Sequence, residues 1–426
     1  MSTLVDTAAR ERIITGTSAG LFVEAGAGSG KTRSLVERIV TLVMVDGARL
    51  AEVAAVTFTE KAGAELRDRL RAEFEQRWQD ARHAGGHRAG RAGGDAAAEG
   101  TAGTPDDPAG QDTGDTDLVD EEDRAARALD DLDSAAIGTL HSFAQRILTM
   151  HPIEAGLPPL VEVMDEVASS VAFEQRWTEL RAELLEEESL SQTLVLAMAA
   201  GVKLDHLRSL AKALGNDWDL IESHVRGAEP PGYTFPDVTE LVARAAELAA
   251  RAAECTDPED RFLERLTALG QWGEQLAAAR DERAQLATLV AAADLRFSYG
   301  RKASWGGRLD ELRGSCQELQ EQAAALVSEV VEALLRPLIH WLAVRVERAA
   351  HERAADGRLE YHDLLVLARQ LLRTSPDVRG ALHGTFRHLL LDEFQDTDPI
   401  QIELAVRIAG GRDADAEDWR DVRVPE

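Results

Sequence analysis

The sequence is poor in cysteine, in aromatic residues and in long apolar runs. Its 426 residues include two cysteines, Cys255 and Cys316, and aromatic residues make up 5% of the chain. Two cysteines cannot build a disulfide framework, and they form no Cys-x-x-Cys or clustered His/Cys pattern typical of a zinc site. This scarcity agrees with a reducing, cytoplasmic environment.

Membrane and secretion signals are also missing from the pattern. No apolar run approaches the ~18 residues that a membrane span needs, and the start, MSTLVDTAARER, has no basic segment followed by an apolar one. We therefore expect neither secretion nor a membrane contact.

Basic residues are few compared with acidic ones. The chain has 47 Lys and Arg against 76 Asp and Glu, a formal net charge of −29. Such a chain repels a polyanion at long range, so any nucleic-acid site has to be local.

What is present predicts an α/β protein with a large helical part. Apolar β-type runs at 21–25, 53–58, 135–139 and 388–392 alternate with helical patterns, which favours a parallel sheet flanked by helices. The run at 135–139 is expected to pass directly into a helix, Leu140–Met150. From about 155 to 355 the pattern is almost continuously helical. A helical domain inserted into an α/β domain accounts for both.

One segment has a different composition. Residues 83–123 are rich in Gly, Ala, Asp and Pro with almost no large apolar residue, and 106–123 contain nine acids and no base. Such a segment cannot bury enough surface to offset its ordering entropy, so we expect a disordered insertion in a surface loop. A regulatory segment is the alternative.

A phosphate-binding pattern follows the first apolar run. The stretch Ala25-Gly26-Ala27-Gly28-Ser29-Gly30-Lys31-Thr32 stands between a predicted strand and a predicted helix. In that context successive backbone N–H groups cradle phosphate oxygens, Lys31 neutralises the β- and γ-phosphates, and the Thr32 hydroxyl ligates Mg²⁺. The pattern usually begins with Gly, and Ala25 is a mild departure.

A second acidic motif completes the expected nucleotide site. Asp392 and Glu393 follow the apolar run Leu389–Leu391. Asp392 is expected to hold Mg²⁺, directly or through water, and Glu393 to polarise the attacking water. Paired acids after a strand are common, and their weight comes from the sequence that follows, Phe394-Gln395-Asp396-Thr397-Asp398-Pro399-Ile400-Gln401.

The motifs together resemble a known family. AGAGSGKTRSL and LLLDEFQDTDPIQ are similar to the ATPase core of superfamily 1 DNA helicases of the UvrD/Rep type, and more closely to its RecB/AddA branch. Three further segments agree in order and character: Thr57–Ala62, Ile137–Phe143 and Glu360–Leu365. The resemblance implies a P-loop NTPase (RecA-like) fold and an ATP-hydrolysing motor that steps 3′ to 5′ along one DNA strand.

The resemblance also assigns roles to individual residues. Arg33 would contact the nucleotide, and Gln395 would sense the γ-phosphate or water. Phe58 and His141 would face single-stranded DNA, although Phe58 could equally be a core residue and His141 could cap its own helix. The hydroxyls expected to contact phosphate or sugar are those of Thr57, Thr59, Thr139 and Ser142.

The resemblance divides the chain into segments. The RecA-like ATPase domain would comprise residues 1–82, 124–153 and 356–410, interrupted by the insertion at 83–123 and the helical domain at 154–355, with a polar tail at 411–426. A basic and aromatic run in the helical domain, Arg296–Arg308, is a second candidate DNA contact through Arg301 and Lys302. An ordinary loop whose aromatics pack inward is an equal alternative.

Two departures from the family pattern shape the expectation. Thr7 stands where we would look for a Gln that reads adenine, and the sequence reaches Glu426 about where the next family motif would begin. We therefore expect the isolated chain to bind Mg·ATP with very weak hydrolysis.

The leading hypothesis is the N-terminal motor portion of an ATP-dependent 3′–5′ DNA helicase, acting on single strands and duplex junctions in recombination or repair. A partner subunit of a helicase-nuclease complex would fit this hypothesis. The alternatives are an ATP-gated single-strand-binding module or truncated product without unwinding, and an acidic scaffold with a vestigial phosphate loop.

Overall fold

The computed structural model describes residues 7–17, 20–26, 29–92, 113–225, 233–393 and 398–424. The chain divides into two compact units. Unit 1 joins Met1–Val163 to Ala355–Glu426, and unit 2 is Met164–Ala354. The expected boundaries of the helical domain, 154 and 355, therefore differ from those of unit 2 mainly at the start.

Unit 1 contains a parallel sheet in the order β2-β1-β5. Its strands are β1 (Val53–Thr57), β2 (Ala136–Thr139) and β5 (His388–Leu391). Both ladders are parallel, with Thr57 opposite Thr139 and Val56 opposite Leu391. Since parallel strands end at the same edge, the residues that follow all three strands meet there.

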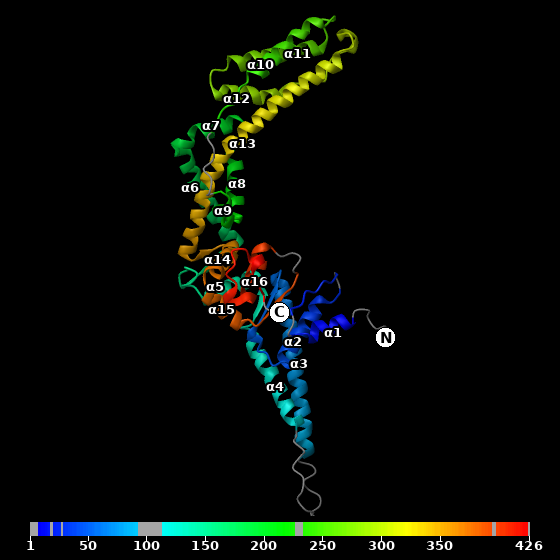
Figure 1. The fold of residues 1–426 in the computed structure, drawn as a ribbon, viewed down its shortest axis with the longest axis vertical. Coiled ribbons are helices and arrows are strands. Elements are labelled where there is room, and N and C mark those ends of the chain that lie inside the picture. Colours follow the sequence, from blue (N-terminus) through cyan, green and yellow to red (C-terminus); the bar gives the residue numbers. More distant parts are fainter. Residues whose placement is uncertain are drawn as a thin grey trace, which may run out of the picture. The chain divides into compact units, whose positions relative to one another are not determined.

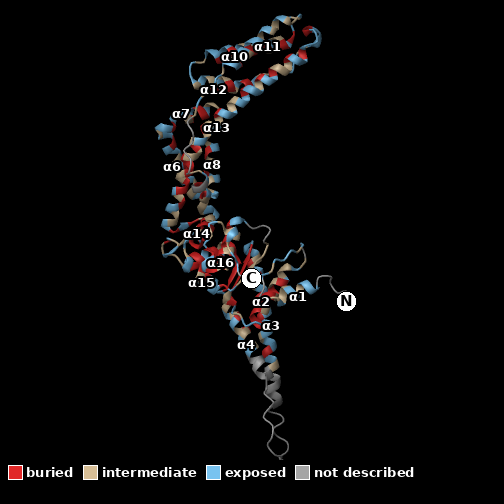
Figure 2. Cartoon of the chain, in the orientation of Figure 1, coloured by how far each residue is buried: buried red, intermediate tan, exposed pale blue. Residues whose placement is uncertain are grey.

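Helices cover the sheet and bury β1 and β2, whereas β5 is half-buried. One face packs against α2 (Lys31–Met44), α3 (Glu60–Ala92) and α4 (Thr113–Asp131), with Ile39, Leu66 and Phe74 in a core that also contains Val53 and Ala55. The helix α5 (Leu140–Met150) follows β2 directly and has the predicted bounds. Figure 2 shows buried residues along the strands and the facing sides of these helices.

The segment expected to be disordered is partly helical. α3 continues to Ala92 and α4 begins at Thr113, so only residues 93–112 of the expected 83–123 insertion lie outside the described residues. α3 and α4 run side by side (Figure 1), and Ala125 and Ala128 of α4 and Leu132 just after it are buried. The prediction was wrong for residues 83–92 and 113–123, because each stretch extends a helix that packs on the other, and tertiary packing overrides composition.

The apolar run Leu21–Ala25 forms no strand, which contradicts the sequence prediction. Residues 20–26 have no regular structure, and Phe22 is 81% exposed. A strand depends on a paired neighbour, which a local apolar pattern does not specify. Within the described part of the chain β5 is paired on one side only, with β1.

The last part of unit 1 is helical. It contains α14 (Tyr361–Thr374), α15 (Pro376–Thr385) and α16 (Pro399–Gly410), and a two-stranded parallel sheet joins β3 (Glu162–Val163) to β4 (Arg358–Leu359). A first helix, α1 (Thr7–Thr15), packs on α2.

The segment after Gly410 is not a loose tail. The buried guanidinium of Arg379 donates to the carbonyl oxygens of Gly411 and Arg412, and that of Arg407 donates to the carbonyls of Ala414 and Ala416. Ala414 is fully buried. These bonds satisfy two buried cations and pin the segment, which its polar composition did not predict.

Unit 2 is helical in every element that the structure assigns between Met164 and Ala354. Its helices are α6 (Glu166–Glu186), α7 (Ser191–Ala199), α8 (Leu204–Asn216), α9 (Ile221–His224), α10 (Thr239–Ala250), α11 (Arg261–Ala278), α12 (Glu282–Ala291) and most of α13 (Leu309–Asp356). A core containing Leu266, Trp272 and Leu312 joins α10, α11, α12 and α13.

Short 3₁₀ turns link several of these elements: η1 (Leu50–Glu52), η3 (Glu188–Leu190), η4 (Trp218–Leu220), η5 (Arg251–Glu254), η6 (Ala292–Asp294), η7 (Lys302–Trp305), η9 (Gly411–Asp413) and η10 (Trp419–Asp421). Among the described helices none is both long and apolar enough to span a bilayer.

Candidate functional site

The phosphate-loop pattern leads directly into α2. Gly30 precedes the helix with φ 88°, a left-handed conformation that glycine adopts without a Cβ penalty, and its carbonyl accepts the first helical bond from the Ser34 N–H. The Ser29 hydroxyl oxygen is buried and has no hydrogen-bond partner among the described residues. Of the predicted loop residues, Ala27 and Gly28 lie outside the described residues.

The loop is held from the side by α1, a contact that sequence reasoning missed. Arg10 donates from Nη2 to the carbonyl of Ser29 at 2.6 Å. Arg38 of α2 donates to the carbonyls of Ile13 and Gly16 at the end of α1. The sequence held a partial indication of this contact, because Arg38 is a cation on a largely apolar face of α2.

The predicted acids lie at the carboxyl end of β5. The Asp392 N–H continues the ladder by donating to the Val56 carbonyl at 2.9 Å, and the Glu393 N–H donates to Asp392 Oδ1. Glu393 has φ 55°, the left-handed region that a side chain with a Cβ seldom adopts. Burial raises the pKa of Asp392 above its usual range, and the neighbouring Glu393 charge acts in the same direction.

Lysine and acid meet across the site. Lys31 Nζ lies 3.1 Å from Glu393 Oε2, and both side chains are partly exposed. Thr32 occupies the next position of α2 and is half-buried. Arg33 instead pairs with Glu37 along α2 and points away as an exposed side chain.

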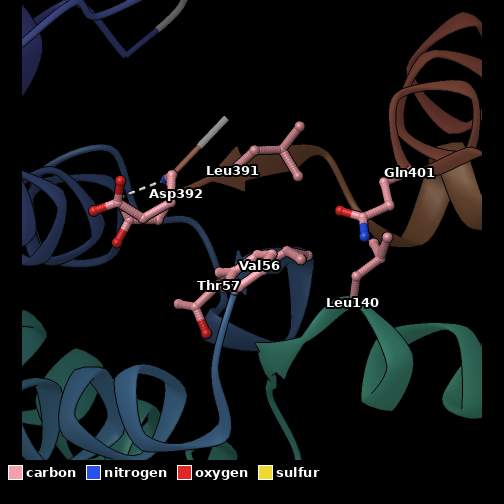
Figure 3. Close-up of a pocket in the computed structure, with 8 residues that line it drawn as sticks. Val56, Thr57, Leu140, Leu391, Asp392 and Gln401 are labelled. Carbon is pink, nitrogen blue, oxygen red and sulfur yellow. Dashed lines mark hydrogen bonds between the residues drawn. The ribbon is translucent and has the colours of Figure 1, made fainter. Parts of the chain in front are cut away.

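A small pocket joins this site to the ends of the neighbouring strands. It is lined by Val56, Thr57, Phe58, Leu140, Leu391, Asp392, Glu393 and Gln401. Figure 3 shows Asp392 on one side of the pocket, and Gln401 with Leu140 on the other. Gln401, in the first turn of α16, is a functional candidate that the sequence analysis quoted within its motif without giving it a role. Gln395 lies outside the described residues.

The predicted DNA-facing residues gather at the same edge of the sheet. Phe58 follows β1 and is 56% exposed, which contradicts the alternative that it is a core residue. His141 stands in the first turn of α5, with its ring edge-to-face against Tyr361 at 5.6 Å between centroids. Tyr361 is 56% exposed and adds an aromatic face to this edge. Phe143, by contrast, is buried against Phe386.

The predicted hydroxyls serve local bonds in this structure. The Thr57 hydroxyl is buried and donates to the Gly138 carbonyl, so it ties β1 to β2 beneath the surface. Thr59 accepts from the Ala62 N–H at the start of α3, and Ser142 donates to the Thr139 carbonyl. Thr139 caps α5 by accepting from the Ser142 N–H and donates its own proton to Glu60 Oε1 at 2.7 Å.

The pKa of His141 is lowered at this edge. Burial is the main cause, the nearby His362 lowers it further, and Glu60 acts in the opposite direction. The neutral imidazole is therefore the larger fraction at the ordinary histidine pKa, and its share grows above it.

The basic and aromatic run of unit 2 is built differently from the expected stacking surface. Phe297 and Trp305 are buried, so they cannot stack on bases. Arg301 pairs with Asp257 and Lys302 with Asp310, while both cations stay exposed. Two of the three aromatics in the run therefore pack inward as the alternative expected, whereas Tyr299 is exposed. The role of the two cations stays a prediction.

Comparisons with known proteins place these motifs in a family. Residues 6–414 match the model of the UvrD/REP helicase N-terminal domain. Curated relatives include an ATP-dependent helicase/nuclease subunit from Pediococcus pentosaceus, 21% identical over 95% of this chain and 33% of the relative, and one from Ligilactobacillus salivarius, 23% identical over the same shares. The exonuclease/helicase subunit RexA from Streptococcus pneumoniae is 22% identical over 92% of this chain and 33% of the relative.

These matches confirm the resemblance drawn from the motifs, including its helicase/nuclease branch. The chain spans about a third of the length of the curated relatives it matches. With the family model covering nearly its full length, the chain belongs to the UvrD/REP helicase N-terminal domain family.

Proposed function

We propose that this chain is the N-terminal motor portion of an ATP-dependent DNA helicase that steps 3′ to 5′ and acts in DNA recombination or repair in the cytoplasm. The observation that carries the proposal is the meeting of Lys31 and Glu393, 3.1 Å apart, at the carboxyl edge of a parallel sheet. Family membership supports the class of reaction, and the names of the curated relatives support a helicase-nuclease assembly with a partner subunit.

The residues present fit a nucleotide and its magnesium. The buried Ser29 hydroxyl lacks a partner in the described structure, which leaves a donor for a phosphate oxygen. In this proposal the loop from Ala25 to Gly30 holds the phosphates, and Lys31 pairs with them. Thr32 and Asp392 would hold Mg²⁺, an oxygen ligand set that this ion prefers.

Bound Mg·ATP would supply the phosphoanhydride bond whose hydrolysis drives stepping. The chain's own residues would orient the attacking water and line the pocket around it. Glu393 is placed to accept a proton from a water molecule, and Gln401 lines the pocket between the acids and the strand ends. Phe58, His141 and Tyr361 would contact single-stranded DNA by stacking, which is independent of sequence.

The domain assignment is part of the proposal. We assign residues 1–82, 124–153 and 356–410 to a RecA-like ATPase domain and the helices between 154 and 355 to an inserted all-α domain. The division of the chain into two compact units, one of them joining both ends of the sequence, supports this assignment.

The proposal is tested by asking whether bound nucleotide changes the affinity of the chain for single-stranded DNA. Binding of a fluorescein-labelled oligothymidylate is measured with no nucleotide, with Mg·ADP and with a non-hydrolysable Mg·ATP analogue. We expect nucleotide to change DNA affinity several-fold, because a coupling free energy of ~1–3 kcal/mol is typical of linked sites. Absence of DNA binding in every nucleotide state would contradict the proposal.

Two further measurements separate the motor from its alternative. DNA-stimulated ATP hydrolysis by the chain identifies a motor, whereas nucleotide binding without turnover identifies an ATP-gated binding module. Displacement of streptavidin from the 5′ end but not the 3′ end of a biotinylated strand establishes the 3′–5′ direction.

A further inference from the structure

Glu60 lies at the carboxyl edge of the sheet, where the proposed function places the phosphates of single-stranded DNA. It is the first residue of α3 and is exposed, and its Oε1 accepts the hydroxyl proton of Thr139 at 2.7 Å. Thr139 is the last residue of β2 and lies opposite Thr57, the last residue of β1. Phe58, whose ring is exposed, directly follows Thr57. The bond between Thr139 and Glu60 therefore lies at the same edge of the sheet as Phe58.

The chemistry of Thr139 makes this contact exclusive. A threonine hydroxyl has one proton to donate and lone pairs that accept. The lone pairs of Thr139 accept from the Ser142 N–H at 3.2 Å, which caps α5, and the single proton goes to Glu60. Thr139 is only 6% exposed. A phosphate oxygen can therefore accept a hydrogen bond from Thr139 only if the Glu60 side chain moves away and Thr139 turns its proton toward the phosphate.

One cation, Lys61, is next to Glu60 in the sequence, and no described salt bridge joins it to the Glu60 carboxylate. The neighbours of Glu60 at the edge are His141, whose pKa is lowered by burial, and the exposed Lys61. Among the salt bridges described for this chain none involves Glu60. A phosphate approaching Thr139 therefore meets a like charge at hydrogen-bond range of the same donor.

We propose that Glu60 is an internal competitor of the DNA backbone, a carboxylate that occupies the phosphate-binding hydroxyl of Thr139 and must be displaced when single-stranded DNA binds. This inference rests on the proposed function, and it names a residue that sets DNA affinity without contacting DNA. Displacement would couple strand binding to the first turn of α3, which begins at Glu60.

The experiment measures the affinity of the full chain for a fluorescein-labelled oligothymidylate by anisotropy at about 0.1 M salt. Glu60→Gln removes the charge and replaces the charge-assisted hydrogen bond from Thr139 by a weaker neutral one, which a phosphate displaces more easily. We expect this variant to bind about fivefold more tightly than the unchanged chain. Glu60→Asp keeps the charge, and we expect no gain in affinity.

A matched control separates local competition from net charge. Glu75→Gln makes the same charge change on the exposed side of α3, fifteen residues further along and roughly 22 Å away at ~1.5 Å per residue. This distance exceeds the ~10 Å Debye length at 0.1 M salt, so at that salt we expect Glu75→Gln to leave the affinity unchanged.

The outcomes are distinct. DNA binding by the unchanged chain with equal or weaker binding by Glu60→Gln would overturn the competitor role and leave the proposed function standing. Equal gains for Glu60→Gln and Glu75→Gln would also overturn it, because net charge alone would then explain them. Absence of DNA binding by every form would contradict the proposed function and this inference together. Thermal unfolding of Glu60→Gln at the unchanged midpoint shows that an affinity change is not a folding defect.

Discussion

Lys31 Nζ and Glu393 Oε2 lie 3.1 Å apart although 362 positions separate the two residues in the sequence. One comes from the first turn of α2 and the other follows β5, and the parallel sheet brings them together. Nucleotide phosphates would have to take Lys31 from Glu393, so this ion pair sets part of the nucleotide affinity.

The first prediction follows from that exchange. Glu393→Gln frees Lys31 and removes a negative charge from the region of the phosphates, so we expect Mg·ATP to bind several-fold more tightly. Hydrolysis should fall, because an amide cannot accept the proton of the attacking water. Fluorescent-nucleotide titration measures the first effect and phosphate release the second.

Glu37→Gln is the control for Glu393→Gln. Glu37 is an acid on the same helix that pairs with Arg33. Tighter nucleotide binding by this control as well would attribute the gain to overall charge and contradict the assignment of Lys31.

The second prediction concerns Asp392. Burial raises its folded-state pKa, so the folded state holds the proton more tightly than the unfolded chain does. The ionised carboxylate therefore costs stability, and this cost grows as pH rises from its ordinary pKa of about 3.9 through the raised value. We expect Asp392→Asn to raise the melting temperature at pH 7 by about 1–2 °C.

The same variant should lose the dependence of nucleotide binding on Mg²⁺, because the amide is a poor ligand for this ion. Calorimetry at pH 7 with and without Mg·ATP measures both effects. A lower melting temperature, or Mg²⁺ dependence equal to that of the unchanged chain, would show that Asp392 is not a desolvated metal ligand. Asp377→Asn, at an exposed acid of α15, should change neither.

The third prediction separates two phenylalanines that the sequence could not distinguish. Phe58→Ala should weaken binding of an oligothymidylate by about tenfold with little loss of stability, because stacking on a base contributes ~1–3 kcal/mol and this side chain is exposed. Phe143→Ala should instead reduce the free energy of unfolding by ~3–5 kcal/mol. Unchanged DNA affinity in Phe58→Ala would remove this residue from the DNA edge.

The fourth prediction is a pH dependence of stability at His141. Burial lowers its folded-state pKa, so the unfolded chain binds the proton more readily. The stability that the neutral ring contributes is complete above the unfolded pKa of about 6.5 and is lost as pH falls toward the lowered value. The pKa of His388 is also lowered by burial, so the effect of one ring has to be read as a difference between variants.

Melting temperatures of the unchanged chain and of His141→Gln are compared at pH 8 and pH 5.5. We expect the unchanged chain to lose more stability on acidification than the variant loses. Equal losses would show that His141 is not desolvated.

The sequence predicted those elements whose signal is local. The helix Leu140–Met150 begins at its threonine cap and has the expected bounds, and the strands at 53 and 388 follow from short apolar runs. The two motifs predicted that Lys31 and the acids after β5 would meet, and Lys31 and Glu393 do lie 3.1 Å apart. The roles of Lys31, Asp392 and Glu393 stay predictions.

The features that the sequence could not provide depend on partners distant in the chain. The run at 21–25 has the composition of a strand but pairs with no neighbouring strand in the described structure. Helix α3 extends to Ala92, although the composition there suggested disorder. The contact between Glu60 and Thr139 arises only once β1 and β2 are in register, so no local pattern reports it.

Nucleotide affinity of Lys31→Ala tests the central claim most directly. The account predicts that the unchanged chain binds Mg·ATP and that Lys31→Ala binds at least tenfold more weakly, because the cation that pairs with the phosphates is gone. Equal affinity of the two proteins for Mg·ATP would contradict the nucleotide site and the motor built on it.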